Sequence, residues 1–252
     1  MLDHLERLLV AEDIGTIWNM HCAQMACYGF DRLIYGFTRF RATQNFGSLD
    51  DTLILSNHEP GYLNSFLGAG LFSEAPMVKW AVGSVGACSW RIVAERAAAG
   101  LLTEGEKKVI ELNRRYNVLA GYSIGFPDTS ARAKGAIGLC AKPGLDQDAV
   151  DAIWAEHGRD LRVLNSIMHL KMSALPFSTT RRPLTARQRE VLEWVGDGKT
   201  SADIAQILGL NIATVEKHLR LAREALEVET TAQALLKASM QKQLFITSAP
   251  QA

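Results

Sequence analysis

The chain has 252 residues, of which 48% are hydrophobic, and its 27 basic side chains balance 27 acidic ones. No apolar run approaches the roughly 20 residues that a membrane-spanning helix needs, and the N-terminus lacks the basic and apolar blocks of a secretion signal. The cysteines, Cys22, Cys27, Cys88 and Cys140, have neither C-x-x-C nor metal-ligand spacing. We therefore expect a cytoplasmic protein with no membrane partner, metal or cofactor, in which the cysteines are small buried hydrophobic residues.

The first half begins with a helical pattern and continues with strands. Residues 2–28 carry Leu, Ile, Trp and Met at helical spacing with one interruption, which predicts two helices. His21 lies on their apolar side, where a hydrogen-bonded core histidine is the expected role. Aromatic and β-branched residues predict strands at 32–40 and 52–55.

The rest of this half alternates helical and strand patterns. Thr103 with Glu106 has the spacing of a capping box, which predicts a helix that begins there and ends near residue 116. The whole order predicts an α+β fold, an α-β-α sandwich with a mainly antiparallel sheet over residues 1–175. The other predicted elements are helices at 59–70 and 75–82, a loop at 83–87, paired strands at 120–126 and 136–141, and a helix at 145–172 with a break near Gly158.

A stretch rich in Pro, Ser, Thr and Arg at 176–183 has the composition of a linker and marks a domain boundary. From residue 176 to the end there are ten basic and eight acidic residues, whereas the preceding part has 17 and 19. This slight basic excess predicts only modest non-specific attraction to phosphate groups.

The second domain, 184–252, is predicted to be an all-α domain of four helices, because each helix has start or stop signals. A short turn joins the second helix to the third, which is the arrangement that inserts a helix into the DNA major groove. The signals are two capping boxes (Thr185 with Gln188 and Thr200 with Asp203), the stop residue Gly209, the cap Asn211 of a third helix that ends near Leu226, and a fourth apolar pattern from Thr231 to Leu244.

The third helix has two faces. Its inward stripe is Val215, Leu219, Ala222 and Leu226, and its outward side carries Ala213, Glu216, Lys217, Arg220 and Glu224. On this pattern alone, an ordinary helical domain with a solvated third helix and a DNA-binding domain remain about equal alternatives.

A resemblance to a known family of transcription regulators favours DNA binding. The stretch Leu184-Thr185-x-Arg187-Gln188-x-Glu190-Val191-Leu192, followed by Gly198-Lys199-Thr200, Asp203-Ile204-Ala205 and Thr214-Val215-x-x-His218, closely resembles the C-terminal helix-turn-helix of LuxR-family transcription regulators. It departs from the family at Gln188, Leu221, Ala225 and Thr231, where Glu, Asn, Lys and Arg are common.

The resemblance implies roles at the DNA. Glu216, Lys217 and Arg220 would face base edges, with Arg220 donating to guanine and Glu216 either accepting from cytosine or opposing other sites. The remaining DNA-binding candidates lie at the starts of the second and third helices: Lys199, Thr200 and Thr214, the first two placed for phosphate contact. The fourth helix would help to pair two copies of the protein on a palindromic operator. The resemblance to transcription regulators also admits RNA polymerase as a partner.

Two other functions are disfavoured. A phosphoacceptor receiver needs carboxylates just after its first strand, whereas Asp50 and Asp51 precede a strand. An enzyme is disfavoured because the chain has no G-x-S-x-G, H-E-x-x-H or phosphate-loop motif.

The first domain is similar to the autoinducer-binding domain of quorum-sensing LuxR regulators. The family pattern N-Y-P-x-x-W-x-x-x-Y, then D-P, then W aligns without a gap from Asn57 to Trp90. Pro76 and Trp90 are retained, and Gly121 matches a family glycine. The other pocket positions hold different residues: His58 for Tyr, Tyr62 for Trp, Phe66 for Tyr, Ala75 for Asp, and Gly138 or Cys140 for a ligand-facing Ser or Thr.

These differences predict altered ligand binding. In the family the Asp accepts the amide N–H of an acyl-homoserine lactone, a bond worth about 1.5–3 kcal/mol, and Ala75 cannot make it. Tyr62 would donate from a different place than the family Trp, and Phe66 lacks the family hydroxyl. We therefore expect weak binding of standard acyl-homoserine lactones.

Three alternatives remain for the pocket. It holds a less polar or aromatic ligand through His58, Tyr62 and Trp90; it is filled by its own side chains; or it binds a lactone through replacement contacts. An alternative for the whole protein is an inhibitor that captures another regulator in a heterodimer. Of the two interpretations of the whole protein, we favour a homodimeric DNA-binding regulator with a small-molecule effector of unknown identity.

Overall fold

The computed structural model of the chain describes residues 1–41, 46–127, 130–177 and 183–246. The chain divides into two compact units, Met1–Ser173 and Ala174–Ala252, here called the first and second units. Most of the linker expected at 176–183 lies outside the described residues, and buried Phe177 belongs to the second unit, where its N–H donates to the carbonyl of Gln241 at 3.1 Å. None of the described helices combines the length and hydropathy needed to cross a bilayer.

The first unit is built on a five-stranded sheet with the order β2-β1-β5-β4-β3, in which every neighbouring pair is antiparallel. The central pair joins distant parts of the sequence, with Leu33 opposite Leu139 and Phe37 opposite Gly135. The strands are β1 (Phe30–Thr38), β2 (Thr52–Ser56), β3 (Gly86–Ser89), β4 (Gly121–Gly125) and β5 (Lys134–Ala141).

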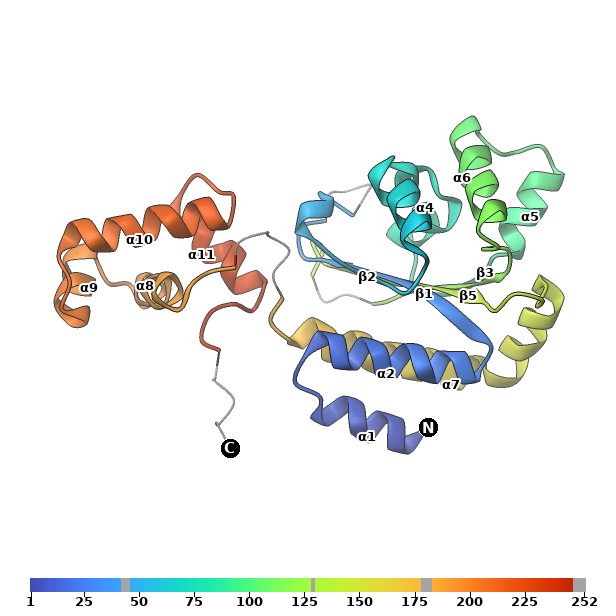
Figure 1. Cartoon of the computed structure of the whole chain (residues 1–252), viewed down its shortest axis with the longest axis horizontal. Helices are drawn as coiled ribbons and strands as arrows, with labels where there is room; N and C mark the ends of the chain where they lie inside the picture. The colour runs from blue at the N-terminus through green and yellow to red at the C-terminus, as the bar shows by residue number, and fades with distance from the viewer. Residues whose placement is uncertain (42–45, 128–129, 178–182, 247–252) are drawn as a thin grey trace. The chain divides into compact units, whose positions relative to one another are not determined.

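Helices cover both faces of this sheet (Figure 1). The predicted α+β fold and its α-β-α sandwich are confirmed. One face carries α1 (Leu2–Val10), α2 (Ile14–Cys27) and α7 (Gln147–Ala174); the other carries α3 (Pro60–Leu63), α4 (Pro76–Gly83), α5 (Arg91–Ala98), α6 (Glu104–Arg115) and the short turns η1 (Leu49–Asp51), η2 (Asn64–Gly68) and η3 (Leu71–Glu74).

Buried histidines lie in the layer that α2 and α7 form against the sheet. His21 is fully buried, and its Nε2 lies 3.0 Å from Oδ1 of Asn165, as expected for a core histidine. Burial lowers the pKa of His21 to about 4. His169 of α7 stacks on Phe126 with ring centroids 4.3 Å apart, and its Nδ1 lies 2.9 Å from the hydroxyl of Tyr35.

The sequence predictions were wrong for several elements of the first unit. Strand β3 begins at Gly86, within the loop expected at 83–87, and it forms because the edge of β4 supplies its hydrogen-bond partners. The helix α5 was not predicted at all. The long helix α7 has no break at Gly158, where a side chain would meet Trp154 Nε1 at 2.7 Å. The expectation of buried cysteines holds only for Cys140, because the other three are partly or fully exposed.

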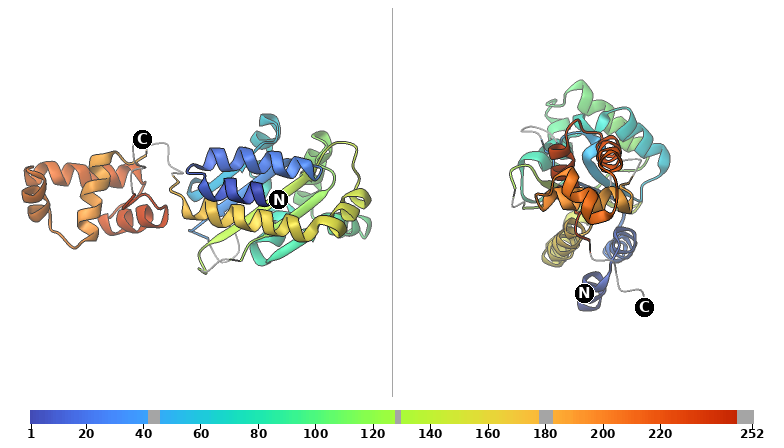
Figure 2. Two further views of the ribbon diagram at one scale, coloured as in Figure 1. Left: turned by 90° about the horizontal axis from the view of Figure 1, so that it is seen from below. Right: turned by 90° about the vertical axis from the view of Figure 1, so that its left-hand side faces the viewer.

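The described residues of the second unit form four helices, two views of which are given in Figure 2. The predicted capping boxes at Thr185 and Thr200 are both present, Asn211 accepts from the backbone N–H of Thr214, and Gly209 adopts the left-handed conformation at φ 63°. A further capping box opens the last helix at Thr230. The helices are α8 (Ala186–Gly196), α9 (Ser201–Leu208), α10 (Ile212–Ala225) and α11 (Thr231–Met240).

Candidate ligand cavity and DNA-binding surface

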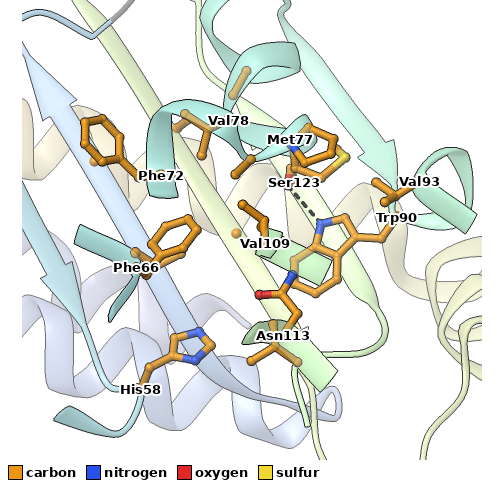
Figure 3. A pocket seen from close by; sticks show the side chains of 18 of the residues that line it. His58, Phe66, Phe72, Met77, Val78, Trp90, Val93, Val109, Asn113 and Ser123 are labelled. Carbon is orange, nitrogen blue, oxygen red and sulfur yellow. Dashed lines mark hydrogen bonds between the residues drawn. The ribbon is translucent and has the colours of Figure 1, made fainter. Parts of the chain in front are cut away.

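A cavity of about 320 Å³ lies between the sheet and the helices α3 to α6 (Figure 3). This volume falls at the lower end of the roughly 300–1,000 Å³ of typical ligand sites. Most of the lining side chains are aliphatic or aromatic, and β1, β2, β4 and β5 form its floor. The first unit therefore contains a preformed apolar site of ligand size.

Trp90 occupies one end of the cavity above two glycines of the sheet. A side chain at Gly121 would come within 2.9 Å of the indole, so the bare backbone there leaves room for this ring, whereas one at Gly138 would lie in ordinary contact with it at 3.8 Å. Trp90 Nε1 donates to Oγ of Ser123 at 2.9 Å (Figure 3). Because Ser123 pairs with Gly138 across β4 and β5, the hydroxyl and the glycine lie side by side in the sheet.

A row of three rings forms another wall. His58 stacks on Tyr62 with ring centroids 4.8 Å apart, and Tyr62 stacks on Phe66 at 5.4 Å. The Tyr62 hydroxyl donates to Oδ1 of Asn113 at 3.0 Å, so the phenol is already held by the protein. Burial lowers the pKa of His58 to about 4, with Arg32 contributing, so the imidazole facing the cavity is neutral at neutral pH.

The cavity lacks an acidic group. Ala75 is buried on its wall and is the N-cap of α4, where it provides no side-chain hydrogen bond. Among the described residues that line the cavity there is no Asp or Glu, and Arg114 is the one charged side chain. An amide N–H of a bound ligand would therefore find no carboxylate acceptor.

The structure brings six of the seven predicted pocket residues together. Cys140 is the exception, because it is buried behind the wall with Tyr62 and Phe66 and is not among the described lining residues. The sequence had left Gly138 and Cys140 as alternatives, and only Gly138 reaches the cavity. The six candidates that lie in the cavity lining are His58, Tyr62, Phe66, Ala75, Trp90 and Gly138.

Four polar residues of this site were not predicted from the sequence: Thr52, Asn113, Arg114 and Ser123. Asn113 follows Val109 by four positions, so an amide on the apolar side of the α6 pattern was a signal that could have identified it. Ser123 depended on the register between β4 and β5, which the sequence does not define.

In the second unit, α9 and α10 present the predicted DNA-binding residues. Lys199, Thr200, Glu216, Lys217 and Arg220 are exposed, and Thr214 is partly buried. The threonine hydroxyls are engaged within their own helix caps, Thr200 with Asp203 and Thr214 with Asn211.

Two of the outward charges have partners within the protein. Glu216 accepts from the Ser201 hydroxyl and so connects the start of α10 to the start of α9. Arg220 forms an i,i+4 pair with Glu224 that is about half exposed, and such pairs contribute little to stability and exchange partners easily. Arg220 is therefore available for contacts with other molecules, whereas Glu216 also has a structural role.

The first unit contains a ligand-sized cavity and the second a helix-turn-helix, a combination that points to a transcription regulator. Residues 13–172 match the model of the autoinducer binding domain, and residues 182–238 match that of the bacterial regulatory proteins of the luxR family. The chain belongs to the LuxR family of transcriptional regulators, with an autoinducer-binding domain and a DNA-binding domain.

Curated relatives agree with this assignment, and solved structures share the fold. The transcriptional activator AnoR of Acinetobacter nosocomialis is 24% identical, with 94% of this chain and 96% of that protein covered, and SolR of Ralstonia nicotianae is 27% identical, with 90% and 92% covered. The fold resembles that of Escherichia coli SdiA (TM-score 0.50, 15% identity, 96% of each chain). It also resembles that of CepR2 from Burkholderia cenocepacia (TM-score 0.52, 19% identity, 68% of this chain and 92% of that one). Proteins of this family are regulators and not enzymes.

Proposed function

We propose that the protein binds a palindromic operator as a homodimer and that an effector with a largely apolar body, other than a standard acyl-homoserine lactone, controls it. The observation that carries the proposal is a preformed cavity whose described lining includes Ala75 and no carboxylate. The open volume supports an effector over a pocket filled by its own side chains. We expect the protein to act in the cytoplasm, where its DNA is.

The polar contacts left in the cavity also argue against a lactone. Tyr62 and Trp90 already donate to Asn113 and Ser123, so a lactone that took over either donor would leave a protein acceptor unpaired. Each lost anchor of about 1.4 kcal/mol reduces affinity tenfold. The loss of two or three anchors should therefore remove high-affinity binding.

Replacing Ala75 tests the ligand part of the proposal. We expect wild-type protein to show no nanomolar binding of standard acyl-homoserine lactones in calorimetry, and Ala75→Asp to bind them at least about tenfold more tightly, because the carboxylate would accept the amide N–H. Ala75→Asn is the matched control of similar shape and should gain less. A strong thermal shift of wild-type protein with a lactone would contradict the proposal.

Exposed apolar side chains support dimerisation. Leu236 is 57% exposed on α11 beside exposed Ala232, and in the first unit Leu9 and Leu170 are each more than 60% exposed on α1 and α7. Contiguous exposed apolar patches often mark surfaces that another chain covers, whereas single exposed leucines are common, so these residues identify candidate faces for dimerisation. A gel shift with genomic fragments separates the two modes of action: binding by the protein alone supports an operator-binding homodimer, whereas no binding without a second regulator favours the heterodimer alternative.

Two substitutions test the assigned DNA contacts. We expect Arg220→Ala to relax discrimination at one base pair of each half-site, because a guanine contact contributes about 1–3 kcal/mol of discrimination. Lys199→Ala should weaken binding to all sequences alike, because phosphate contacts carry no base information. Titration of both proteins against a set of single-base operator variants measures the two effects. Each protein variant serves as the control for the other. Uniform loss in both would refute the assignment.

A further inference from the structure

We propose that the effector is an amphipathic monocarboxylate, with an aliphatic or aromatic body inside the cavity and its carboxylate paired with Arg114 at the mouth. This inference rests on the proposed function, in which the cavity binds an effector. It adds the chemical class of the ligand and the direction in which the ligand lies.

The mouth can be located from residues that both line the cavity and reach solvent. These are Ala94 and Ala97 of α5, Arg114 at the end of α6, and Leu119, which is 60% exposed in the segment before β4. The remaining lining residues are buried or partly buried. The cavity therefore opens between α5, the end of α6 and the segment that contains Leu119.

Arg114 is unengaged at this opening. Among the described residues its guanidinium has no ion-pair or hydrogen-bond partner, although Glu111 lies one turn earlier on α6. A guanidinium presents two parallel N–H donors that match a carboxylate, and such charge-assisted pairs are stronger than neutral hydrogen bonds. An anionic head group would complete this site.

The interior could not accommodate that head group. Trp90 donates to Ser123 and Tyr62 to Asn113, and the neutral ring of His58 offers no positive charge. Burying a carboxylate without a cation costs several kcal/mol. The acid must therefore remain at the mouth, with the apolar body directed toward Trp90 and the stacked rings.

The charge of Arg114 distinguishes a carboxylate ligand from neutral ligands with the same body. An ester or alcohol with the same body would fill the cavity equally well but would leave Arg114 without a negatively charged partner. The carboxylate should then bind about tenfold more tightly than its methyl ester, a difference typical of one partly exposed charged hydrogen bond.

The test is calorimetry at pH 7.5 on the purified full-length chain with decanoate, methyl decanoate, decanol and decanoyl-homoserine lactone. We expect decanoate to bind about tenfold more tightly than the ester or the alcohol, and Arg114→Gln to abolish that preference. Lys108→Gln removes an exposed cation from the same helix outside the cavity lining and should leave the preference unchanged.

The outcomes distinguish this inference from the function on which it rests. If a neutral probe binds as tightly as decanoate, or if Arg114→Gln keeps the preference, the carboxylate assignment is wrong while the cavity remains a ligand site. If no probe of any class binds to the folded protein, both the assignment and the proposed effector are contradicted.

Discussion

Acidification from pH 6.5 to pH 4 is expected to remove several kcal/mol of unfolding free energy from the first unit. Burial lowers the pKa of His21, His58 and His169 to about 4, whereas the unfolded chain titrates near 6.5. The unfolded state therefore takes up these protons first, so stability is greatest above pH 6.5 and decreases as the pH falls toward 4. Each histidine contributes up to about 1.4 kcal/mol per pH unit in this window.

A substitution at His169 tests whether protonation of a buried histidine causes this loss of stability. Burial is the main reason for its low pKa, and the nearby cations of Lys134 and Arg39 add to it. In His169→Phe the aromatic contact with Phe126 can remain while the titrating group is lost. Urea unfolding at pH 7, 6 and 5 should show a variant that is less stable at pH 7, because the Tyr35 contact is gone, but has a shallower pH dependence. Equal pH dependence in the two proteins would rule out this explanation.

Gly121→Ala is expected to destabilise the first unit by about 3 kcal/mol, at the upper end of the usual overpacking cost. The new methyl carbon would lie 2.2 Å from the Leu139 carbonyl oxygen and 2.9 Å from the Trp90 indole. Leu139 cannot retreat easily, because β5 is held between β1 and β4. The indole would also be displaced, with loss of its hydrogen bond to Ser123.

Gly68→Ala is the matched control, since no atom lies within 4 Å of its added methyl group and the residue is exposed. Its unfolding free energy should stay within about 0.5 kcal/mol of wild type. Urea unfolding followed by tryptophan fluorescence measures both variants. A loss below 1 kcal/mol in Gly121→Ala would mean that the sheet adapts more readily than its pairing suggests.

The second unit was predictable because its signals are local. The caps at Thr185, Thr200 and Asn211 and the stop at Gly209 each act within about four residues, and all four are present in the structure. The inward and outward faces of α10 follow from helical spacing in the same way. No partner from elsewhere in the chain was needed to infer them.

The first unit shows where such inference ends. Strand β3 is composed of Gly, Ala, Cys and Ser, which have little preference for strands, and it forms only because β4 supplies its partners. The choice between Gly138 and Cys140 and the position of Ser123 likewise depended on pairing across the sheet. Whether the pocket is open or filled depends on packing among side chains from several elements, which no single segment encodes.

The antiparallel pairing of β1 with β5 has a consequence for how the protein is made. Phe37 is opposite Gly135, so the two central strands are separated by about 100 residues of chain. At a synthesis rate of roughly 5–20 residues per second, β1 waits about 5–20 seconds on the ribosome before β5 exists. Contacts this distant also fold slowly. The period before β5 is synthesised is therefore the stage at which the nascent chain is most vulnerable to aggregation. A compound present during translation would act on a chain that is still assembling its binding site.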